Sequence, residues 1–137
     1  MTEPARSNPM MTHAIPCLGY RDARTAIQWL VDAFGADARH VYDGPDNTVS
    51  HGEVWFGSSC VMMGTLKDNN MPPHKAGESA VYIVVSSAAE VDRLHASAVQ
   101  HGAQIVISLR DTDYGSHDFG ALDPEGNFWG FGTYAPE

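Results

Sequence analysis

The chain has 137 residues, of which 43% are hydrophobic and 18% are charged, so it can bury one packed core and is not of disordered composition. Its 17 Asp and Glu against 8 Lys and Arg give a formal charge of −9, which excludes the basic surface that nucleic acid requires. This acidity serves solubility, and it also favours a cationic small ligand. Residues 80–85, the longest apolar run, are too short to span a membrane. The two cysteines form no disulfide framework and no signal peptide is seen, so we predict a cytoplasmic protein.

The first half of the chain predicts the order β-α-β-β-β. Residues 1–12 are polar and broken by prolines, and we expect a flexible tail there; residues 14–20 predict a strand. Residues 22–35 predict a helix, because Asp22 is a typical N-cap and Gly35 a typical end. Strands are expected at 36–42, 48–57 and 58–65, the last two joined by a tight turn. The predicted buried stripe of the helix is Ala23, Ala26, Ile27, Leu30, Val31 and Phe34.

The second half repeats this order after a linker at 66–79 that contains two prolines. A strand is expected at 80–85. A helix is expected at 87–102, opened by a capping box of Ser87 with Glu90 and closed by Gly102. Strands are expected at 103–109, 116–123 and 127–134, with a turn at 124–126. The predicted buried stripe of this helix is Val91, Leu94, Ala98 and Val99.

Three ordered matches indicate an internal duplication. Gly35-Ala36 matches Gly102-Ala103 at an offset of 67, Ser50-His51 matches Ser116-His117 at 66, and Gly64-Thr65 matches Gly132-Thr133 at 68. We therefore predict an α+β fold of two βαβββ modules, residues 13–65 and 80–135, which form a cupped eight-stranded mixed sheet with helices on the outer face. The concave inner face of such a sheet is a natural pocket for a small molecule.

Paired βαβββ modules that end in "DPEGNFWGF" resemble the vicinal oxygen chelate superfamily of glyoxalase I, extradiol dioxygenases, fosfomycin-resistance enzymes and bleomycin-resistance proteins. The resemblance covers about residues 13–135. Residues 20–36 resemble the family's first helix. Residues 50–64 are similar to the hairpin of its PhnB-like or bleomycin-resistance-like branch.

The resemblance implies metal-binding His, Gln or Glu side chains in strands one, four, five and eight. These positions fall near Ile15, at Met62 or Met63, at residues 80–82 and at Gly130, and none of these suits a divalent ion. A shift of the alignment adds only His13, and one ligand does not hold a metal. We therefore expect no metal and no cofactor.

The resemblance then favours a metal-independent, homodimeric small-molecule-binding protein of the kind that confers antibiotic resistance by sequestering a drug. Its partner would be a small molecule, cationic or aromatic, and neither nucleic acid nor a membrane. Two alternatives stay open. One is a metal-dependent lyase or transferase of glyoxalase or fosfomycin-resistance type with displaced ligands. The other is a scaffold that has kept the fold and lost the site. Whether the protein is an enzyme is left undecided.

Alternating side chains on two strands supply the candidate site. His51, Glu53 and Trp55 share one face, and the matching face of the second module would show His117, Phe119 and Ala121. The His-x-Glu pair suits ligand contact, a displaced metal site or a general base, although this face can equally point to solvent or a dimer partner. Trp129 and Phe131 either line the cup, where they suit a planar or cationic guest, or belong to the core. The predicted ligand-binding residues are His51, Glu53, Trp55, Met63, Tyr82, His117, Trp129 and Phe131.

Overall fold

The computed structural model describes residues 13–68, 73 and 75–136 of the chain, and these form two βαβββ modules. The first contains β1 (Cys17–Tyr20), α1 (Ala23–Phe34), β2 (Asp37–Asp43), a 3₁₀ turn (Pro45–Asn47), β3 (Val49–Phe56) and β4 (Ser59–Thr65). The second contains β5 (Ala80–Val84), α2 (Ala88–Gln100), β6 (Gln104–Asp111), β7 (His117–Leu122) and β8 (Phe128–Gly132). The predicted α+β class is confirmed. The predicted tail at 1–12 lies outside the described residues.

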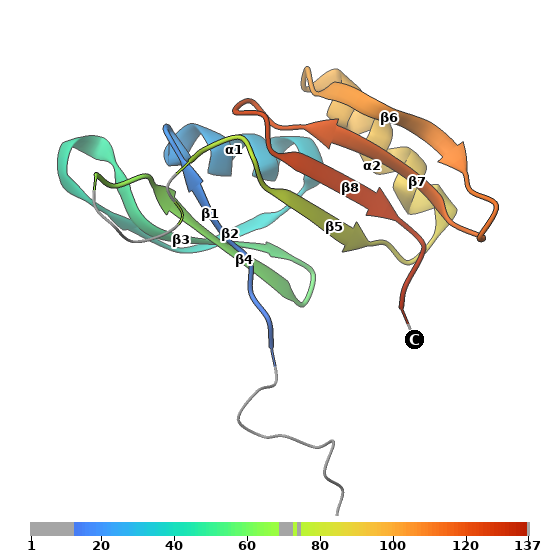
Figure 1. Ribbon diagram of the computed structural model, residues 1–137, viewed down its shortest axis with the longest axis horizontal. Helices are drawn as coiled ribbons and strands as arrows, with labels where there is room; N and C mark the ends of the chain where they lie inside the picture. Colours follow the sequence, from blue (N-terminus) through green and yellow to red (C-terminus); the bar gives the residue numbers. More distant parts are fainter. Residues whose placement is uncertain (1–12, 69–72, 74, 137) are drawn as a thin grey trace, which may run out of the picture.

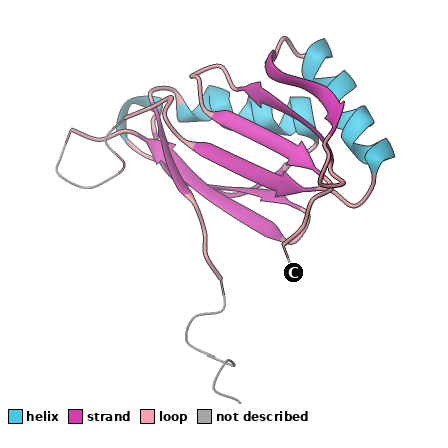
Figure 2. Ribbon diagram, turned by 45° about the vertical axis from the view of Figure 1, so that its right-hand side comes forward, coloured by secondary structure: helices cyan, strands magenta, loops and turns pink. Residues whose placement is uncertain are grey.

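Each module builds a four-stranded mixed sheet, so the eight predicted strands form two halves of the same topology. The strand orders are β1-β4-β3-β2 and β5-β8-β7-β6, with β1 parallel to β4 and β5 parallel to β8. The other neighbours are antiparallel. Figure 1 shows the two sheets beside each other, and in Figure 2 the helices lie along one side of the strands.

The predicted caps begin and end the helices. The Asp22 carboxylate accepts a hydrogen bond from the Thr25 N–H at 3.1 Å, and Gly35 ends α1 with a φ of +67°, which favours glycine. The Ser87 hydroxyl accepts from the Glu90 N–H at 3.2 Å, whereas the Glu90 carboxylate pairs with Arg93. Within the described residues, neither helix is long and apolar enough to cross a membrane.

The buried stripes of the helices differ from the prediction at three positions. Ala33 is fully buried on α1, where Val31 is only half-buried. Val99 on α2 is 53% exposed, so its predicted burial is wrong. Helix α1 packs against elements of both modules, and this shifts the stripe of side chains that it buries. Val99 is exposed because it lies on the outer side of α2.

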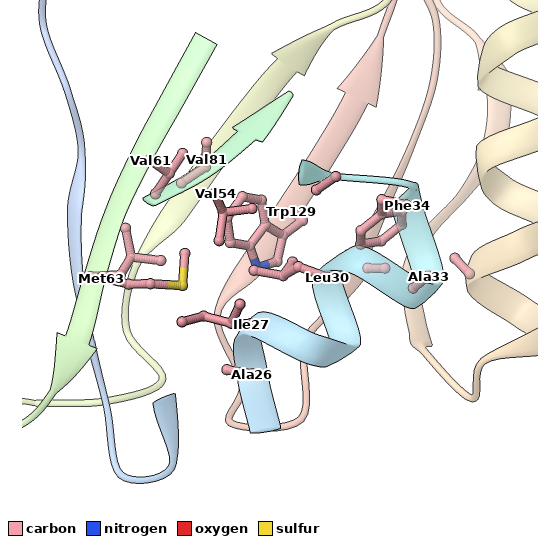
Figure 3. Packing of buried hydrophobic residues seen from close by; sticks show 14 of the residues in the cluster. Ala26, Ile27, Leu30, Ala33, Phe34, Val54, Val61, Met63, Val81 and Trp129 are labelled. Carbon is pink, nitrogen blue, oxygen red and sulfur yellow. The ribbon is translucent and has the colours of Figure 1, made fainter. Parts of the chain in front are cut away.

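One hydrophobic core joins the two modules. Figure 3 shows Trp129 of β8 beside Leu30 of α1 and Val54 of β3. The Phe131 and Phe34 ring centroids lie 4.4 Å apart, and those of Trp129 and Phe56 lie 5.5 Å apart. Such aromatic contacts add to the burial of apolar area. Among the described strands the two sheets are not paired with each other, so side chains hold the modules together.

The turn between β7 and β8 fastens the second module to the first. The Asp123 carboxylate accepts hydrogen bonds from the Tyr20 hydroxyl at 2.6 Å and from the Trp129 Nε1–H at 3.0 Å. The Glu125 carboxylate accepts the backbone N–H groups of Arg21 and Asp22, both at 2.7 Å. Burial, followed by the charge of Asp123, raises the pKa of Tyr20 well above its usual value, so this hydroxyl stays a donor. The "DPEGN" turn is therefore a structural clamp.

Candidate ligand-binding site

The face of the first sheet that points away from α1 carries the main group of candidate side chains. Leu18, Val54 and Met63 point toward the helix and are buried. Because side chains alternate along a strand, His51, Glu53 and Trp55 of β3 lie on the opposite, open face. The open face of this sheet is the surface described below.

A carboxylate held by two neighbours lies at the centre of this face. The Glu53 carboxylate accepts from the Trp55 Nε1–H at 3.1 Å and lies 3.3 Å from the His51 Nε2. The Trp55 hydrogen bond, followed by that of His51, holds the pKa of Glu53 below its usual value, so the group is an anion at neutral pH. The Arg39 guanidinium lies 4.7 Å from the centroid of the Trp55 ring, in a cation–π contact.

Two cavities adjoin this row of side chains. The first, of about 340 Å³, lies on β1, β3 and β4 and is lined by His51, Met62 and Cys17 among others. The second, of about 690 Å³, lies between the β3–β4 turn, residues 13–16 and β5, and is lined by Trp55 and Tyr82 among others. Both volumes are in the range of small-molecule sites. Glu53 bonds to one residue of each cavity and therefore lies between the two.

The open face of the second sheet is covered by aromatic rings that lie on glycines. A Cβ placed on Gly130 would be 3.0 Å from the Phe128 ring and 3.3 Å from the Tyr82 ring, and one on Gly132 would be 2.6 Å from the Tyr82 hydroxyl oxygen. The sequence predicts that these glycines allow a close approach, and the structure shows that the protein's own rings make it. The Tyr82 hydroxyl donates to the Tyr134 carbonyl at 2.9 Å, which fixes its ring in this position.

His117 is not the structural counterpart of His51. The match of Ser50-His51 with Ser116-His117 is out of register, and His117 lies on the other face of its sheet. Phe119 pairs with Phe131 as Gly52 pairs with Met63, and these pairs are on the helix side. His117 also points to that side. Its Nε2 lies 2.6 Å from Asp92 of α2, and its Nδ1 lies 2.7 Å from Asp111 of β6. These two hydrogen bonds raise the pKa of His117.

One extra residue in β3 explains the error. Asp43 pairs with Val49 and Tyr42 with His51, so Ser50 is additional, whereas in the second module Asp111 and Arg110 pair with the consecutive residues 117 and 118. The Val49 N–H donates to the Thr65 hydroxyl at 2.9 Å, and the His117 N–H donates to the Thr133 hydroxyl at 3.0 Å. Val49 is therefore the counterpart of His117, and Asp118 is the counterpart of His51. In the sequence, the change of offset from 66 at the Ser-His pairs to 68 at the Gly-Thr pairs indicated that the Ser-His match was out of register.

The sequence matches the family model of the Glyoxalase/Bleomycin resistance protein/Dioxygenase superfamily over residues 11–131. The chain belongs to this superfamily.

Several relatives and solved structures resemble this superfamily member. The uncharacterised proteins Rv0887c of Mycobacterium tuberculosis and Mb0911c of Mycobacterium bovis are each 29% identical over 122 residues, which is 85% of this chain and 71% and 80% of those proteins. The crystal structure of TioX from Micromonospora sp. ML1 has a TM-score of 0.74 at 26% identity and covers 90% of this chain and 99% of that one. A glyoxalase/bleomycin resistance protein from Streptomyces sp. CB03234, at 16% identity and a TM-score of 0.67 over 88% and 98%, shares the fold.

Four of the eight predicted site residues lie at the open face or its cavities with side chains that are at least partly exposed: His51, Glu53, Trp55 and Tyr82. His51 and Glu53 meet on the open face, Trp55 and Tyr82 line the second cavity, and Met63 borders the first cavity although its side chain is only 4% exposed. The others are His117 at the α2 contact and two core residues, Trp129 and Phe131. Sequence reasoning missed three open-face neighbours, Arg39, Cys60 and Phe128, of which the alternation of β4 pointed to Cys60.

The residues at the superfamily's metal positions do not fit a divalent ion. Met62 offers a thioether and Tyr82 a phenol, and neither is a preferred ligand of an oxygen-seeking divalent cation. At Gly130 the space that a carboxylate side chain would need holds the Phe128 and Tyr82 rings. Across residues 13–68, 73 and 75–136, no three His, Cys, Asp or Glu side chains are grouped so as to hold a metal ion.

Proposed function

We propose that this superfamily member binds a small organic molecule on the open face of its first sheet, and that it does so without a divalent metal ion. The observation that carries the proposal is the row of His51, Glu53 and Trp55, in which one ionised carboxylate lies between two cavities. A hydrogen-bonded anion with an aromatic ring beside it supplies both charge recognition and stacking.

The chemistry of this face favours a flat aromatic cation as the guest. The Trp55 ring already holds the planar guanidinium of Arg39 at 4.7 Å, so it lies in surroundings that attract a planar cation. Tyr82 adds a second ring to the larger cavity, and it is 42% exposed. The charge of −9 steers a cation toward the protein at low ionic strength.

The same side chains support sequestration of the guest rather than its turnover. The lyases and transferases of the alternative prediction need a metal to polarise substrate oxygens, and Met62, Tyr82 and Gly130 support no such centre. We also propose that the protein acts as a homodimer. Exposed apolar side chains at the second cavity, Ile15 and Val84, offer a surface for a second copy.

Ligand titrations followed by intrinsic fluorescence test the proposal. The probes are a flat cation (ethidium), an uncharged ring of the same shape (phenanthridine) and a flat anion (naphthalene-2-sulfonate). We expect the cation to bind most tightly, the neutral ring less tightly and the anion least. The Glu53→Gln substitution should weaken the binding of the cation by about 5-fold to 20-fold, which is the scale of a charge-assisted contact. The neutral ring should bind both proteins equally.

Two controls make the result specific. Glu78→Gln removes an exposed carboxylate away from the face and should leave ethidium binding unchanged. Trp55→Ala should weaken ethidium binding, and its control is Trp29→Phe, which replaces a tryptophan that lies on α1 and not on the open face. Titrations with Ni²⁺, Zn²⁺, Mn²⁺ and Fe²⁺ should neither show stoichiometric binding nor alter ethidium binding. Tight stoichiometric binding of one of these ions would support the metal-dependent alternative, and the absence of binding by all three probes would favour a scaffold without a site.

A further inference from the structure

We propose that Cys17, Cys60 and Met62 form a binding site for one soft monovalent metal ion, Cu(I) or Ag(I), on the open face of the first sheet. Three sulfur-bearing residues lie on this face, on two neighbouring strands. Cys17 of β1 is the direct register partner of Met62 in the parallel pair. Cys60 lies two residues before Met62 on β4 and so points to the same face. The inference does not depend on the proposed organic guest, because it uses other atoms.

The spacing of the three residues suits a bridging ion and does not suit a disulfide. Neighbouring strands lie about 4.8 Å apart and alternate residues of a strand about 6.6 Å apart, which sets the Cα atoms of Cys17 and Cys60 about 8 Å apart along the diagonal. A disulfide needs Cα atoms within about 7 Å, and both cysteines are free thiols. An ion held by sulfur at about 2.3 Å from each ligand spans the remaining gap.

The ligand types select the kind of metal. Thiolate and thioether sulfur prefer Cu(I), whereas carboxylate and carbonyl oxygen prefer Mg²⁺, Ca²⁺ or Mn²⁺. Cys17 and Met62 line the same cavity of about 340 Å³, and Cys17 is solvent-exposed, so an ion has a way in. Cys60 is half-buried and lines the neighbouring second cavity.

Binding would proceed without any change of oxidation state. Each cysteine thiol releases its proton to solvent as its sulfur–metal bond forms, and the Met62 thioether binds as a neutral ligand. Two thiolates and one monovalent ion leave a single negative charge at the site. The Glu53 carboxylate adds to this negative charge, and the Arg39 guanidinium opposes it.

Competition for Cu(I) with bathocuproine disulfonate, under anaerobic and reducing conditions, tests the site. We expect one equivalent to be held by the wild-type protein, and we expect Cys17→Ser and Cys60→Ser each to weaken binding more than about 10-fold. Met62→Leu should weaken it less. Met63→Leu is the matched control, because Met63 lies next to Met62 and points toward α1, and it should leave the affinity unchanged.

A second measurement keeps the result independent of folding. Ag(I) should protect Cys17 and Cys60 together from alkylation by iodoacetamide, as read by mass spectrometry of the intact wild-type protein. Binding that survives both serine substitutions would overturn the proposal. So would equal losses in Met62→Leu and Met63→Leu, alkylation of both cysteines at the rate of the metal-free protein, or the absence of any binding by the wild type.

Discussion

Removal of the Tyr20 hydroxyl should cost more stability than removal of any surface hydroxyl. The hydroxyl donates to the Asp123 carboxylate at 2.6 Å, and the two residues are 0% and 5% exposed. Tyr20→Phe deletes this one hydrogen bond and keeps the packing of the ring. It therefore weakens the clamp between the modules without leaving a cavity.

The expected loss follows from the number of donors that remain. A hydrogen bond to a charged group contributes about 1.5–3 kcal/mol to stability. Asp123 keeps four donors, namely the Trp129 Nε1–H, the Asn127 Nδ2–H and two backbone N–H groups, so we expect the lower part of this range, about 1.5–2 kcal/mol. With an unfolding entropy of about 2.1 cal/mol/K per residue, this corresponds to a decrease in Tm of about 5–7 °C.

Urea unfolding and calorimetry of Tyr20→Phe and Asp123→Ala measure the effect. Asp123→Ala leaves several buried donors without an acceptor and should cost about 3–5 kcal/mol. The double variant should lose about 1 kcal/mol less unfolding free energy than the sum of the two single losses, because both substitutions remove the same hydrogen bond. Tyr42→Phe is the control, since Tyr42 is 56% exposed. A Tyr20→Phe variant within about 0.5 kcal/mol of wild type, or fully additive losses, would refute the clamp.

Three further variants test other parts of the structure. His117→Gln should cost most stability at low pH: the two aspartates raise the pKa of His117, so its contribution is fully present below the usual value of about 6.5 and is lost as pH rises through the raised pKa. Urea unfolding from pH 5.5 to 9 should show the two proteins converging, and a constant difference would contradict this. Gly120→Ala places a Cβ into the Phe128 ring and should cost about 1–3 kcal/mol in thermal unfolding, an effect that should be smaller in a Phe128→Ala background. Glu125→Ala removes the acceptor of two backbone N–H groups before α1 and should cost about 1–2 kcal/mol, whereas Glu125→Gln should cost less; equal losses would indicate that the charge, not the hydrogen bonds, matters.

Local signals predicted most of the elements, because their causes lie within a few residues. Asp22 and Gly35 bound α1 as expected, since an N-cap acceptor and a left-handed φ depend on the helix end alone. The alternation of β3 placed His51 and Glu53 on one face for the same kind of reason. The likeness of the two halves correctly predicted two modules of one topology.

Long-range packing determined the features that the sequence left open or indicated wrongly. One extra residue in β3, Ser50, sets the Ser-His match out of register, and the pairing of β3 with β2 locates that residue. His117 is therefore not the counterpart of His51, and it faces α2. The core position of Trp129 depends on α1 and β3 of the other module.

Gly130 illustrates the division between the two kinds of information. Its sequence position showed that no carboxylate stands there, and this required only a comparison of residue types. The pairing of β5, β7 and β8 brings two rings from different strands, Phe128 and Tyr82, over this glycine. Only the tertiary structure therefore decided that its open side is filled. The sequence by itself thus determined the local elements, their caps and the repeat, since these follow from neighbours along the chain. Which side chains share a cavity, a core or a clamp was decided by contacts between residues as many as 104 positions apart.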